Sequence, residues 1–360
     1  MKRRNFLAGA GVGAVAGIAF SAPAIAKQVR KLTMVTDWPE GPGVLTSARR
    51  LARTIEEASQ GRIRIEVTPA GAVVRPFETF DAVQSGVADM FHSHIGYFEK
   101  KSQALHFFSG LPFGFSANEL FAWVKYGGGQ DVWDTLTAPF NIKPMLCSST
   151  GSQMGGWFKN EINSPDDFKG LRYRMSSPGA EVLRRMGAVA VVVPGSDIVL
   201  SLESGAIEAC EWIGPWMDLI MGLNKAAGFY YYPAWQEPGT ALTLGINRQV
   251  WESFSEGDRR LIEIAAAGEY SISLAEFNSN NATALRQLRT EGTVKIERFN
   301  DAVLRKLREV SDEVVAEKGS ADALSLGVYK SYTAFRELIT GWTDTGEGAY
   351  LNTRGRRSIS

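Results

Sequence analysis

The sequence predicts an α/β protein built of two lobes, with one long helix and a C-terminal helical segment. Three features indicate this fold. Residues 32–68 have the pattern of strand, helix and strand, and residues 151–175 open a second unit in which strands and helices alternate. Helical spacing is then sustained from residue 255 to residue 290, with Ser255 as the expected N-cap. Each alternating unit buries its own core, and the chain is long enough for two cores.

The first unit is predicted from its hydrophobic periodicity. In the first expected helix apolar residues recur every three or four positions until Gly61, and the strand that follows alternates apolar and polar side chains. Gly127, Gly128 and Gly129 are interpreted as a turn, because a phosphate loop needs a Lys-Ser or Lys-Thr pair after its glycines. The expected elements are strands at 32–36, 62–68 and 87–93 and helices at 44–60, 77–85 and 119–126.

We expect the rest of the chain to be arranged around residues 151–175, which carry the first candidate binding residues. A glycine-rich stretch carries Gln153 and leads to Ser164 and Pro165, which are typical of a helix start. Arg172 and Arg174 follow on a short strand that is otherwise apolar. A guanidinium group stays charged and can bind a carboxylate with two parallel hydrogen bonds, so an arginine directed into a cleft suits an organic acid. The alternative is that both arginines are solvated strand residues.

The remaining elements complete the second unit and the tail. Asn300 is the expected N-cap of a helix over 301–318, and another amphipathic helix begins at residue 330. The other expected helices are 178–187, 196–204 and 215–224, and the strands are 188–193, 206–212, 241–246 and 294–299. The apolar face of the last helix consists of Tyr332, Phe335, Leu338, Ile339 and Trp342.

Residues 1–26 predict an export signal. Basic residues at positions 2–4 precede an apolar stretch at 8–20, and Ala24-Ile25-Ala26 is a small-residue cleavage site. The segment 3–7, Arg-Arg-Asn-Phe-Leu, resembles the twin-arginine motif, although the arginines also suit a general secretory signal. No later stretch is apolar enough to span a bilayer, so we expect a soluble periplasmic protein.

The composition is that of a globular protein. Hydrophobic residues make up 44% of the chain, and 39 basic residues balance 39 acidic ones. A net charge near zero argues against nucleic acid or an anionic membrane surface as the main partner. Cys147 and Cys210 lie among apolar or small residues and lack metal-site spacing. They could form a disulfide in an oxidising compartment or remain two buried thiols.

Two α/β units behind an export signal describe a two-lobed periplasmic solute receptor. Three segments strengthen this interpretation: the run 151–174, the Glu-Trp-Ile-Gly-Pro segment 211–215, and the Tyr-Tyr-Tyr-Pro-Ala-Trp-Gln-Glu segment 230–237. Together they resemble the solute receptors of tripartite ATP-independent periplasmic (TRAP) transporters, above all the subgroup that binds 2-oxo acids. The resemblance implies a periplasmic-binding-protein fold with a helix bridging both lobes, hinged closure on the ligand, and delivery to a membrane permease.

The resemblance also implies the site residues. Arg174 matches the arginine that grips the ligand carboxylate, and Arg172 matches a merely basic position. Glu211, Trp212 and Glu237 match positions that hold a cation, sodium or calcium, with Trp212 contributing its backbone carbonyl. The other expected substrate-binding residues are Gln153, Trp212 and Tyr97, the last by a looser match.

A bridging cation makes physical sense at this place. Two carboxylates beside an organic acid would repel it, whereas a hard cation taking oxygen ligands from both sides joins them. The implied ligand is a small monocarboxylic 2-oxo or 2-hydroxy acid: pyruvate-like, branched or lactate-like. The alternative for Glu211 and Glu237 is that they are ordinary surface carboxylates.

Two segments depart from the subgroup. The first loop, 36–40 (Thr-Asp-Trp-Pro-Glu), is more acidic than expected beside an anion, and Trp235-Gln236 replaces an aromatic pair. Both changes predict altered selectivity, with a longer, branched or hydroxylated acid as the alternative ligand.

The resemblance suggests the domain limits and the assembly. We expect lobe 1 to comprise 27–150 and about 240–285, and lobe 2 to comprise 151–239 and about 286–329. Residues 330–360 form the C-terminal helix and tail, whose apolar face needs cover. A homodimer formed through this segment is expected; packing back on the chain's own lobes is the alternative.

Two rival functions remain. A receptor of an ATP-driven importer for organic acids would share the lobes but lack the three-segment pattern. An exported enzyme could use Glu211 or Glu237 as general base with His92 or His94. The sequence has three histidines, and His92 and His94 lack the spacing of a helical zinc pair. We therefore expect a receptor and no enzyme.

Overall fold

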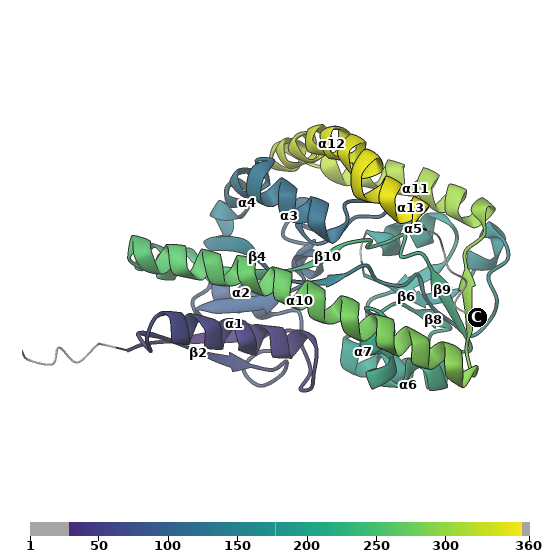
Figure 1. Ribbon diagram of the computed structural model, residues 1–360, viewed down its shortest axis with the longest axis horizontal. Helices are drawn as coiled ribbons and strands as arrows, with labels where there is room; N and C mark the ends of the chain where they lie inside the picture. Colours follow the sequence, from purple (N-terminus) through teal and green to yellow (C-terminus); the bar gives the residue numbers. More distant parts are fainter. Residues whose placement is uncertain (1–28, 177, 355–360) are drawn as a thin grey trace, which may run out of the picture.

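The protein contains two mixed β-sheets, each covered by helices and placed side by side (Figure 1). A computed structural model describes residues 29–176 and 178–354. The expected export signal at 1–26 and the last residues of the tail lie outside these ranges. The two sheets confirm the predicted two-lobed α/β class.

The first sheet has the strand order β2-β1-β3-β10-β4. Strands β1, β2 and β3 are parallel, and β10 enters antiparallel between β3 and β4. Its strands are β1 (Arg30–Thr36), β2 (Ile63–Thr68), β3 (Met90–Ser93), β4 (Ile142–Gly151) and β10 (Thr240–Asn247). The helices around it are α1 (Val44–Ala58), α2 (Thr79–Gln84), α3 (Ala117–Tyr126), α4 (Gly129–Thr137) and α9 (Arg248–Glu252), with 3-10 turns η1 (Ile95–Phe98), η2 (Gln103–Phe108) and η3 (Ala138–Phe140).

The second sheet has the strand order β11-β9-β5-β8-β6-β7. Strands β6, β7 and β8 are parallel, and β5 is antiparallel to β8 and β9. Its strands are β5 (Gly156–Phe158), β6 (Arg172–Arg174), β7 (Val189–Val191), β8 (Ala209–Cys210), β9 (Phe229–Tyr232) and β11 (Lys295–Arg298). Its helices are α5 (Gly179–Arg185), α6 (Ile198–Glu203), α7 (Pro215–Met221) and α8 (Leu223–Ala226), with η4 (Pro165–Phe168) and η5 (Gly195–Asp197).

Helix α10 (Glu256–Glu291) runs past both sheets (Figure 1). Its N-cap is Ser255, whose hydroxyl accepts a hydrogen bond from the Asp258 backbone, as predicted. The helix packs on β4 and α1 of the first unit and on α7 of the second. One helix of 36 residues therefore contacts both lobes, which confirms the bridging helix.

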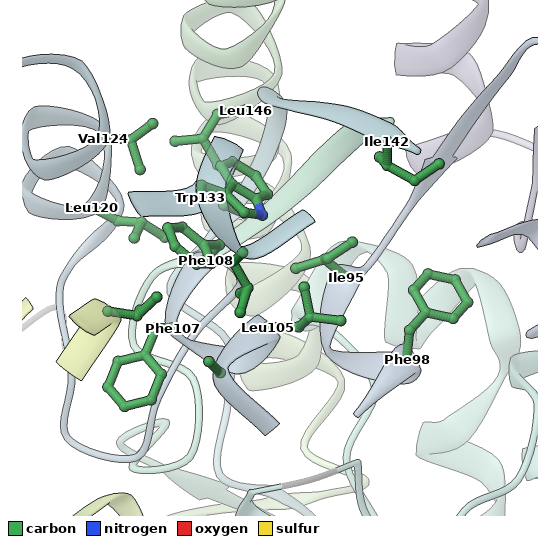
Figure 2. Packing of buried hydrophobic residues seen from close by; sticks show 14 of the residues in the cluster. Ile95, Phe98, Leu105, Phe107, Phe108, Leu120, Val124, Trp133, Ile142 and Leu146 are labelled. Carbon is green, nitrogen blue, oxygen red and sulfur yellow. The ribbon is translucent and has the colours of Figure 1, made fainter. Parts of the chain in front are cut away.

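Aromatic and aliphatic side chains fill the core of the first unit. Phe108 lies between two tryptophans, stacked on Trp133 at 4.4 Å and on Trp123 at 5.0 Å between ring centroids. Figure 2 shows Phe108 and Trp133 near the middle of this cluster and Phe98 at its edge. Helix α4, which carries Trp133, was not predicted from the sequence, because its first residue Gly129 belongs to the glycine run interpreted as a turn.

The two long C-terminal helices pack on different units. Helix α11 (Asp301–Gly319) packs on α5, and α12 (Ala323–Thr343) packs on α4 and η2. Tyr332 is buried, and Phe335 and Ile339 pack against the same cluster. These three residues therefore favour the alternative of packing on the chain's own lobe. The chain continues through the π-helical turn η6 (Asp344–Gly348) to α13 (Ala349–Thr353).

Cys147 and Cys210 are both free and buried, on strands of different sheets. The structure therefore has two separate thiols and no disulfide between them. Within residues 29–176 and 178–354, none of the helices combines the length and hydropathy needed to cross a membrane.

Candidate functional site

A cavity lies where the two sheets bring the carboxyl ends of their parallel strands together. Strands β1 and β3 end just before Trp38 and His94, and β6 and β8 end at Arg174 and before Glu211. Ligands of α/β proteins bind outside the carboxyl ends of strands, where loops diverge from the sheet. The cavity is lined by Trp38, Val44, His94, Tyr97, Thr150, Gln153, Arg174, Ser176, Glu211, Trp212, Ile213, Glu237, Thr240 and Leu242.

All six site residues predicted from the sequence line this one cavity. They come from segments more than 100 residues apart, from Tyr97 in the first unit to Glu237 just before β10. Residues that the sequence analysis missed are His94, Thr150, Ser176 and Thr240. Their position in the sequence could have identified them, because each lies at or within two residues of one end of a strand, on the side of the sheet where the cavity lies.

Arg174 is almost fully buried and has partners on three sides. Its Nη1 donates to the Glu211 carbonyl oxygen at 2.8 Å and to Glu211 Oε1 at 2.5 Å, and its Nε donates to the Val193 carbonyl at 3.1 Å. The guanidinium carbon lies 5.4 Å from the ring centroid of Trp212. Burial disfavours its charge, but the Glu211 carboxylate outweighs burial and raises the pKa of Arg174.

Arg172 lies on the same strand but does not line the cavity. Its side chain is 47% exposed and lies 3.3 Å from Glu208. Residues 172 and 174 are two positions apart on a strand, so they lie on the same face of the sheet. Arg172 is exposed because it is the first residue of β6, whereas Tyr173 and Arg174 are buried. Of the two arginines, Arg174 is the one that lines the cavity.

Glu211 is buried beside Arg174 and accepts a second, longer hydrogen bond from the Ser176 backbone at 3.3 Å. Burial raises the pKa of Glu211 to about 7; Arg174 opposes this shift, and the negative charge of Glu237 adds to it. The cavity therefore holds one firmly charged guanidinium and a carboxyl group whose ionisation depends on Arg174 and Glu237.

Glu237 is held from the opposite side of the cavity. Its Oε2 accepts hydrogen bonds from Gln153 Nε2 at 2.8 Å and Thr240 Oγ1 at 3.0 Å, and its Oε1 lies 3.3 Å from His94 Nε2. Burial disfavours the carboxylate, but the charge interaction with His94 and these hydrogen bonds lower the pKa of Glu237 overall. Glu237 is thus the firmly ionised member of the pair.

Several polar atoms at the cavity wall lack a partner. Thr150 Oγ1, Gln153 Oε1 and Trp212 Nε1 are buried and have no hydrogen-bond partner among the described residues. Buried polar groups nearly always have a partner, so a wall with three such atoms suits a polar ligand.

The segment after Glu211 is braced by Asp218. The Asp218 carboxylate accepts hydrogen bonds from the backbone of Ile213 and Gly214, from Trp157 Nε1 at 2.9 Å and from the Tyr230 hydroxyl at 2.6 Å. These contacts hold the backbone that follows Trp212. Asp218 itself is buried and does not line the cavity, so it acts as a support for this segment.

The acidic first loop does not bring its carboxylates to the cavity. Asp37 accepts hydrogen bonds from the Phe77 backbone at 2.6 Å, from Thr79 and from Ser93, and Glu40 is exposed and paired with Arg49. Trp235 is buried in the core, and Gln236 donates to the Met154 carbonyl. These four side chains do not line the cavity, whereas Trp38 of the same loop does, and the altered selectivity stays a prediction.

The residues present fit a cation only together with a ligand. Within the part of the chain that the structure describes, no group of three or more His, Cys, Asp or Glu side chains could hold a metal ion. Glu211, Glu237 and the Trp212 carbonyl supply too few oxygen atoms for calcium, which takes six to eight. Oxygen atoms of an acid bound beside them would complete the set.

Of the two histidines considered as acid-base partners, His94 lies 3.3 Å from Glu237, and His92 does not line the cavity. His92 accepts a hydrogen bond from Trp38 Nε1 at 2.8 Å and contacts Ser148 Oγ at 3.0 Å, and burial lowers its pKa to about 3. It is a neutral core residue outside the cavity. His94 lines the cavity but lies against Glu237.

The cavity is small in this structure. Its volume is about 20 Å³, which leaves room for roughly one or two water molecules. A carboxylic acid therefore needs the lobes to separate, or the Arg174–Glu211 contact to part, before it can enter.

Comparison with known proteins places these features in a family. Residues 34–321 match the model of bacterial extracellular solute-binding protein, family 7. A monocarboxylate 2-oxoacid-binding periplasmic protein of a Nostoc species is 37% identical over 89% of this chain and 87% of its own length.

Two solved structures are similar over nearly the whole fold. A TRAP transporter solute-binding protein of Bordetella bronchiseptica, a mixed-occupancy dimer with calcium and picolinate in one site, has a TM-score of 0.87 and 32% identity over 90% of this chain and 96% of its own. A TRAP periplasmic solute-binding protein of Pseudoalteromonas atlantica with sodium and pyruvate has a TM-score of 0.87 and 31% identity over 90% and 99%. The chain therefore belongs to family 7 of the bacterial extracellular solute-binding proteins, the solute receptors of TRAP transporters.

Proposed function

We propose that the protein binds a small monocarboxylic 2-oxo or 2-hydroxy acid together with a cation and delivers it to the membrane permease of its transporter. One observation carries this proposal: a buried arginine, Arg174, and two buried carboxylates, Glu211 and Glu237, line the same cavity between the lobes. The acid leaves chemically unchanged, so the function requires no catalytic residue.

Arg174 is the proposed carboxylate clamp. A planar guanidinium group can donate two parallel hydrogen bonds to a carboxylate, and burial strengthens them because little water competes. Thr150, Gln153 and Tyr97 lie around the same cavity and would orient the rest of the acid. The unpartnered atoms of Thr150 and Gln153 support this role.

Glu211, Glu237 and the backbone carbonyl of Trp212 are the proposed cation ligands. An anionic acid beside two buried carboxylates and one guanidinium would leave an excess of negative charge, which is costly in a buried site. Sodium or calcium offsets that charge and binds oxygen atoms of both the acid and the protein. The ions named with the two similar structures, calcium and sodium, support the same chemistry here.

We also propose the lobe limits and the location. Lobe 1 comprises 27–150 and about 240–285, and lobe 2 comprises 151–239 and about 286–329; the distribution of strands between the two sheets supports these limits. Residues 1–26 direct export to the periplasm, with a twin-arginine motif at 3–7. The Nostoc relative is named as periplasmic.

The proposed function is tested with a panel of ligands. Binding to the folded state raises the melting temperature by mass action, so pyruvate, lactate and branched 2-oxo acids should raise it in the presence of calcium or sodium. Chelation of calcium in sodium-free buffer should shrink these shifts. A simple fatty acid lacks the second oxygen and should give little shift, and dicarboxylates should give less than 2-oxo monocarboxylates. Best responses to dicarboxylates or sugars, or indifference to cation removal, would contradict the proposal.

We propose a homodimer formed through the outer face of α12. Tyr332, Phe335 and Ile339 pack on the chain's own lobe, but Leu338 and Trp342 are 73% and 70% exposed. Two large apolar side chains one turn apart suit an interface with a second copy. The dimer named with the Bordetella structure supports this assembly.

Light scattering tests the dimer. The wild-type protein should have the mass of a dimer at micromolar concentration, and Trp342→Asp should shift it toward a monomer because a charge would be buried in the interface. Leu200→Asp is the matched control, since Leu200 is 70% exposed on α6 and should leave the mass unchanged. A monomeric wild-type protein would end this proposal.

A further inference from the structure

The peptide group between Trp212 and Ile213 is held by Asp218 from its N–H side. The Ile213 N–H donates to Asp218 Oδ1 at 3.2 Å, and the Trp212 carbonyl belongs to the same peptide group. A peptide group is planar and nearly always trans, so its C=O and N–H point in opposite directions. The Trp212 carbonyl therefore points away from Asp218. Trp212 lines the binding cavity, whereas Asp218 does not.

The next peptide group is fixed at both of its ends. The Gly214 N–H donates to the same Asp218 oxygen at 3.1 Å, and the Ile213 carbonyl accepts a hydrogen bond from the Met154 N–H at 3.3 Å. Residue 215 is a proline, which has no N–H. A rotation of the Trp212 carbonyl would break the contact of the Ile213 N–H and strain the fixed group beside it.

Asn281 on α10 takes up the N–H that would otherwise compete for the Trp212 carbonyl. In an α-helix a backbone N–H bonds to the carbonyl four residues earlier, which for Trp216 is the carbonyl of Trp212. The Trp216 N–H donates to Asn281 Oδ1 at 3.0 Å instead. Asn281 also lies close to Gly214, where an added Cβ atom would come within 3.2 Å of its amide. The bridging helix thus keeps a local donor away from the Trp212 carbonyl.

Asp218 is itself anchored in the core. It is 1% exposed, and its Oδ2 accepts hydrogen bonds from Trp157 Nε1 at 2.9 Å and the Tyr230 hydroxyl at 2.6 Å. The Trp157 and Tyr230 rings stack with centroids 3.9 Å apart on the paired strands β5 and β9. Burial raises the pKa of Asp218 to about 6, and hydrogen bonds from Tyr230 and Trp157 oppose this shift, so Asp218 is mainly ionised at neutral pH. An ionised carboxylate only accepts hydrogen bonds, which suits the four donors around it.

We propose that Asp218 and Asn281 are positioning residues that direct the Trp212 carbonyl at the bound cation. This inference rests on the proposed function, because it requires a cation held by Glu211, Glu237 and that carbonyl. Neither positioning residue lines the cavity, so both act through the backbone of segment 212–216. A carbonyl that is already directed needs no rearrangement when the ion binds. Loss of a partner behind a metal ligand typically costs about ten- to a hundredfold in metal affinity.

Titration calorimetry with pyruvate tests Asp218. The calcium effect is the ratio of the affinity for pyruvate in calcium to the affinity after chelation in sodium-free buffer. Asp218→Ala removes the acceptor of the Ile213 N–H, so the calcium effect should fall by roughly tenfold or more. Asp218→Asn keeps one oxygen atom that can accept from both the Ile213 and Gly214 N–H groups, so it should retain most of the calcium effect.

A spectroscopic measurement reports on this one peptide group. The sequence contains a single Trp-Ile pair, Trp212-Ile213. Protein labelled with ¹³C at tryptophan carbonyls and ¹⁵N at isoleucine therefore gives one carbonyl-to-amide correlation in NMR spectra. Calcium with pyruvate should shift its ¹³C resonance in the wild-type protein and in Asp218→Asn, and should shift it much less in Asp218→Ala. A general loss of stability would not change this one resonance in the folded protein.

Asn281→Ala tests the inference without disturbing the core, because Asn281 is half-buried on α10. The freed Trp216 N–H can then bond to the Trp212 carbonyl, and the ion must break that bond. The calcium effect should fall by roughly threefold to tenfold, the equivalent of one hydrogen bond. Asn280→Ala is the matched control: Asn280 Nδ2 donates to the Glu276 carbonyl of its own helix at 2.9 Å, and the calcium effect should persist.

The outcomes separate this inference from the proposed function. A wild-type calcium effect in folded Asp218→Ala or in Asn281→Ala would overturn the positioning role and leave the cation site standing. An equal loss in Asp218→Asn and Asp218→Ala would show that the charge of Asp218 acts, and not its hold on the backbone, which also overturns the inference. A wild-type protein whose affinity for pyruvate is the same with and without calcium would overturn the cation site and this inference together.

Discussion

Replacing Arg174 with alanine is expected to abolish measurable binding of the acid. The side chain is 1% exposed, so its loss leaves the ligand carboxylate buried without a partner, at a cost of about 3 to 5 kcal/mol. That corresponds to a loss of affinity of roughly several hundredfold or more. Arg174→Lys should recover only part of it, because an ammonium group cannot donate the two parallel hydrogen bonds of a guanidinium. Titration calorimetry measures all three proteins.

Arg172→Ala is the matched control for this experiment. Arg172 lies two residues away on the same strand, but its side chain is 47% exposed and pairs with Glu208, so affinity should stay nearly normal. Arg174 also holds Glu211 through two hydrogen bonds, so the melting temperature of the unliganded Arg174 variants must be recorded beside the affinity. Normal binding by a folded Arg174→Ala protein would show that the clamp is another residue.

Replacing Glu237 with glutamine is expected to remove the dependence on the cation together with most of the affinity. Glu237 is the carboxylate whose pKa is lowered, so it carries full charge at neutral pH, and the amide of glutamine is a weaker oxygen ligand without charge. The acid would then face Glu211 without a bridging ion. We expect its affinity in calcium to fall by roughly a hundredfold, measured by calorimetry with and without chelator.

Glu208→Gln is the control for this experiment. Glu208→Gln alters a partly exposed carboxylate paired with Arg172, away from the cavity, and should leave the cation effect intact. Because Gln153 and Thr240 both donate to Glu237 Oε2, the glutamine variant should keep its fold by presenting its carbonyl oxygen to them. If that variant retains the full calcium effect, Glu237 does not hold the ion.

The local sequence pattern predicts a helix correctly where apolar residues recur with a clear helical period or where a clear N-cap residue precedes them. The Ser255 cap and the Asn300 cap mark the starts of α10 and α11 as expected. Helix α4 was missed because Gly129 looks like part of a turn, yet a Cβ atom at that position would come within 2.9 Å of the Trp123 ring. The glycine is required by the close approach of α3 and α4, which no local rule detects.

The start of α12 was also misplaced, for a local reason. The apolar face suggested a start near residue 330, but the helix begins at Ala323, where the Asp322 side chain accepts a hydrogen bond from the Ser325 backbone. Leu324 and Leu326 in the first turns are exposed and Gly327 follows them, so the apolar face located the middle of the helix and not its start.

The sequence by itself determined the α/β class, the long helix and six of the residues around the cavity. Its alternating periods dictate strands and helices, and its resemblance to one family pointed to Arg174, Glu211 and Glu237. Tertiary structure alone decided how these groups act on one another: that Arg174 is bound to Glu211, that Glu237 is held by Gln153 and Thr240, and that Asp37 turns away from the ligand. The reason is physical, because burial and the charge of neighbours set the state of a carboxylate, and both depend on residues distant in the chain.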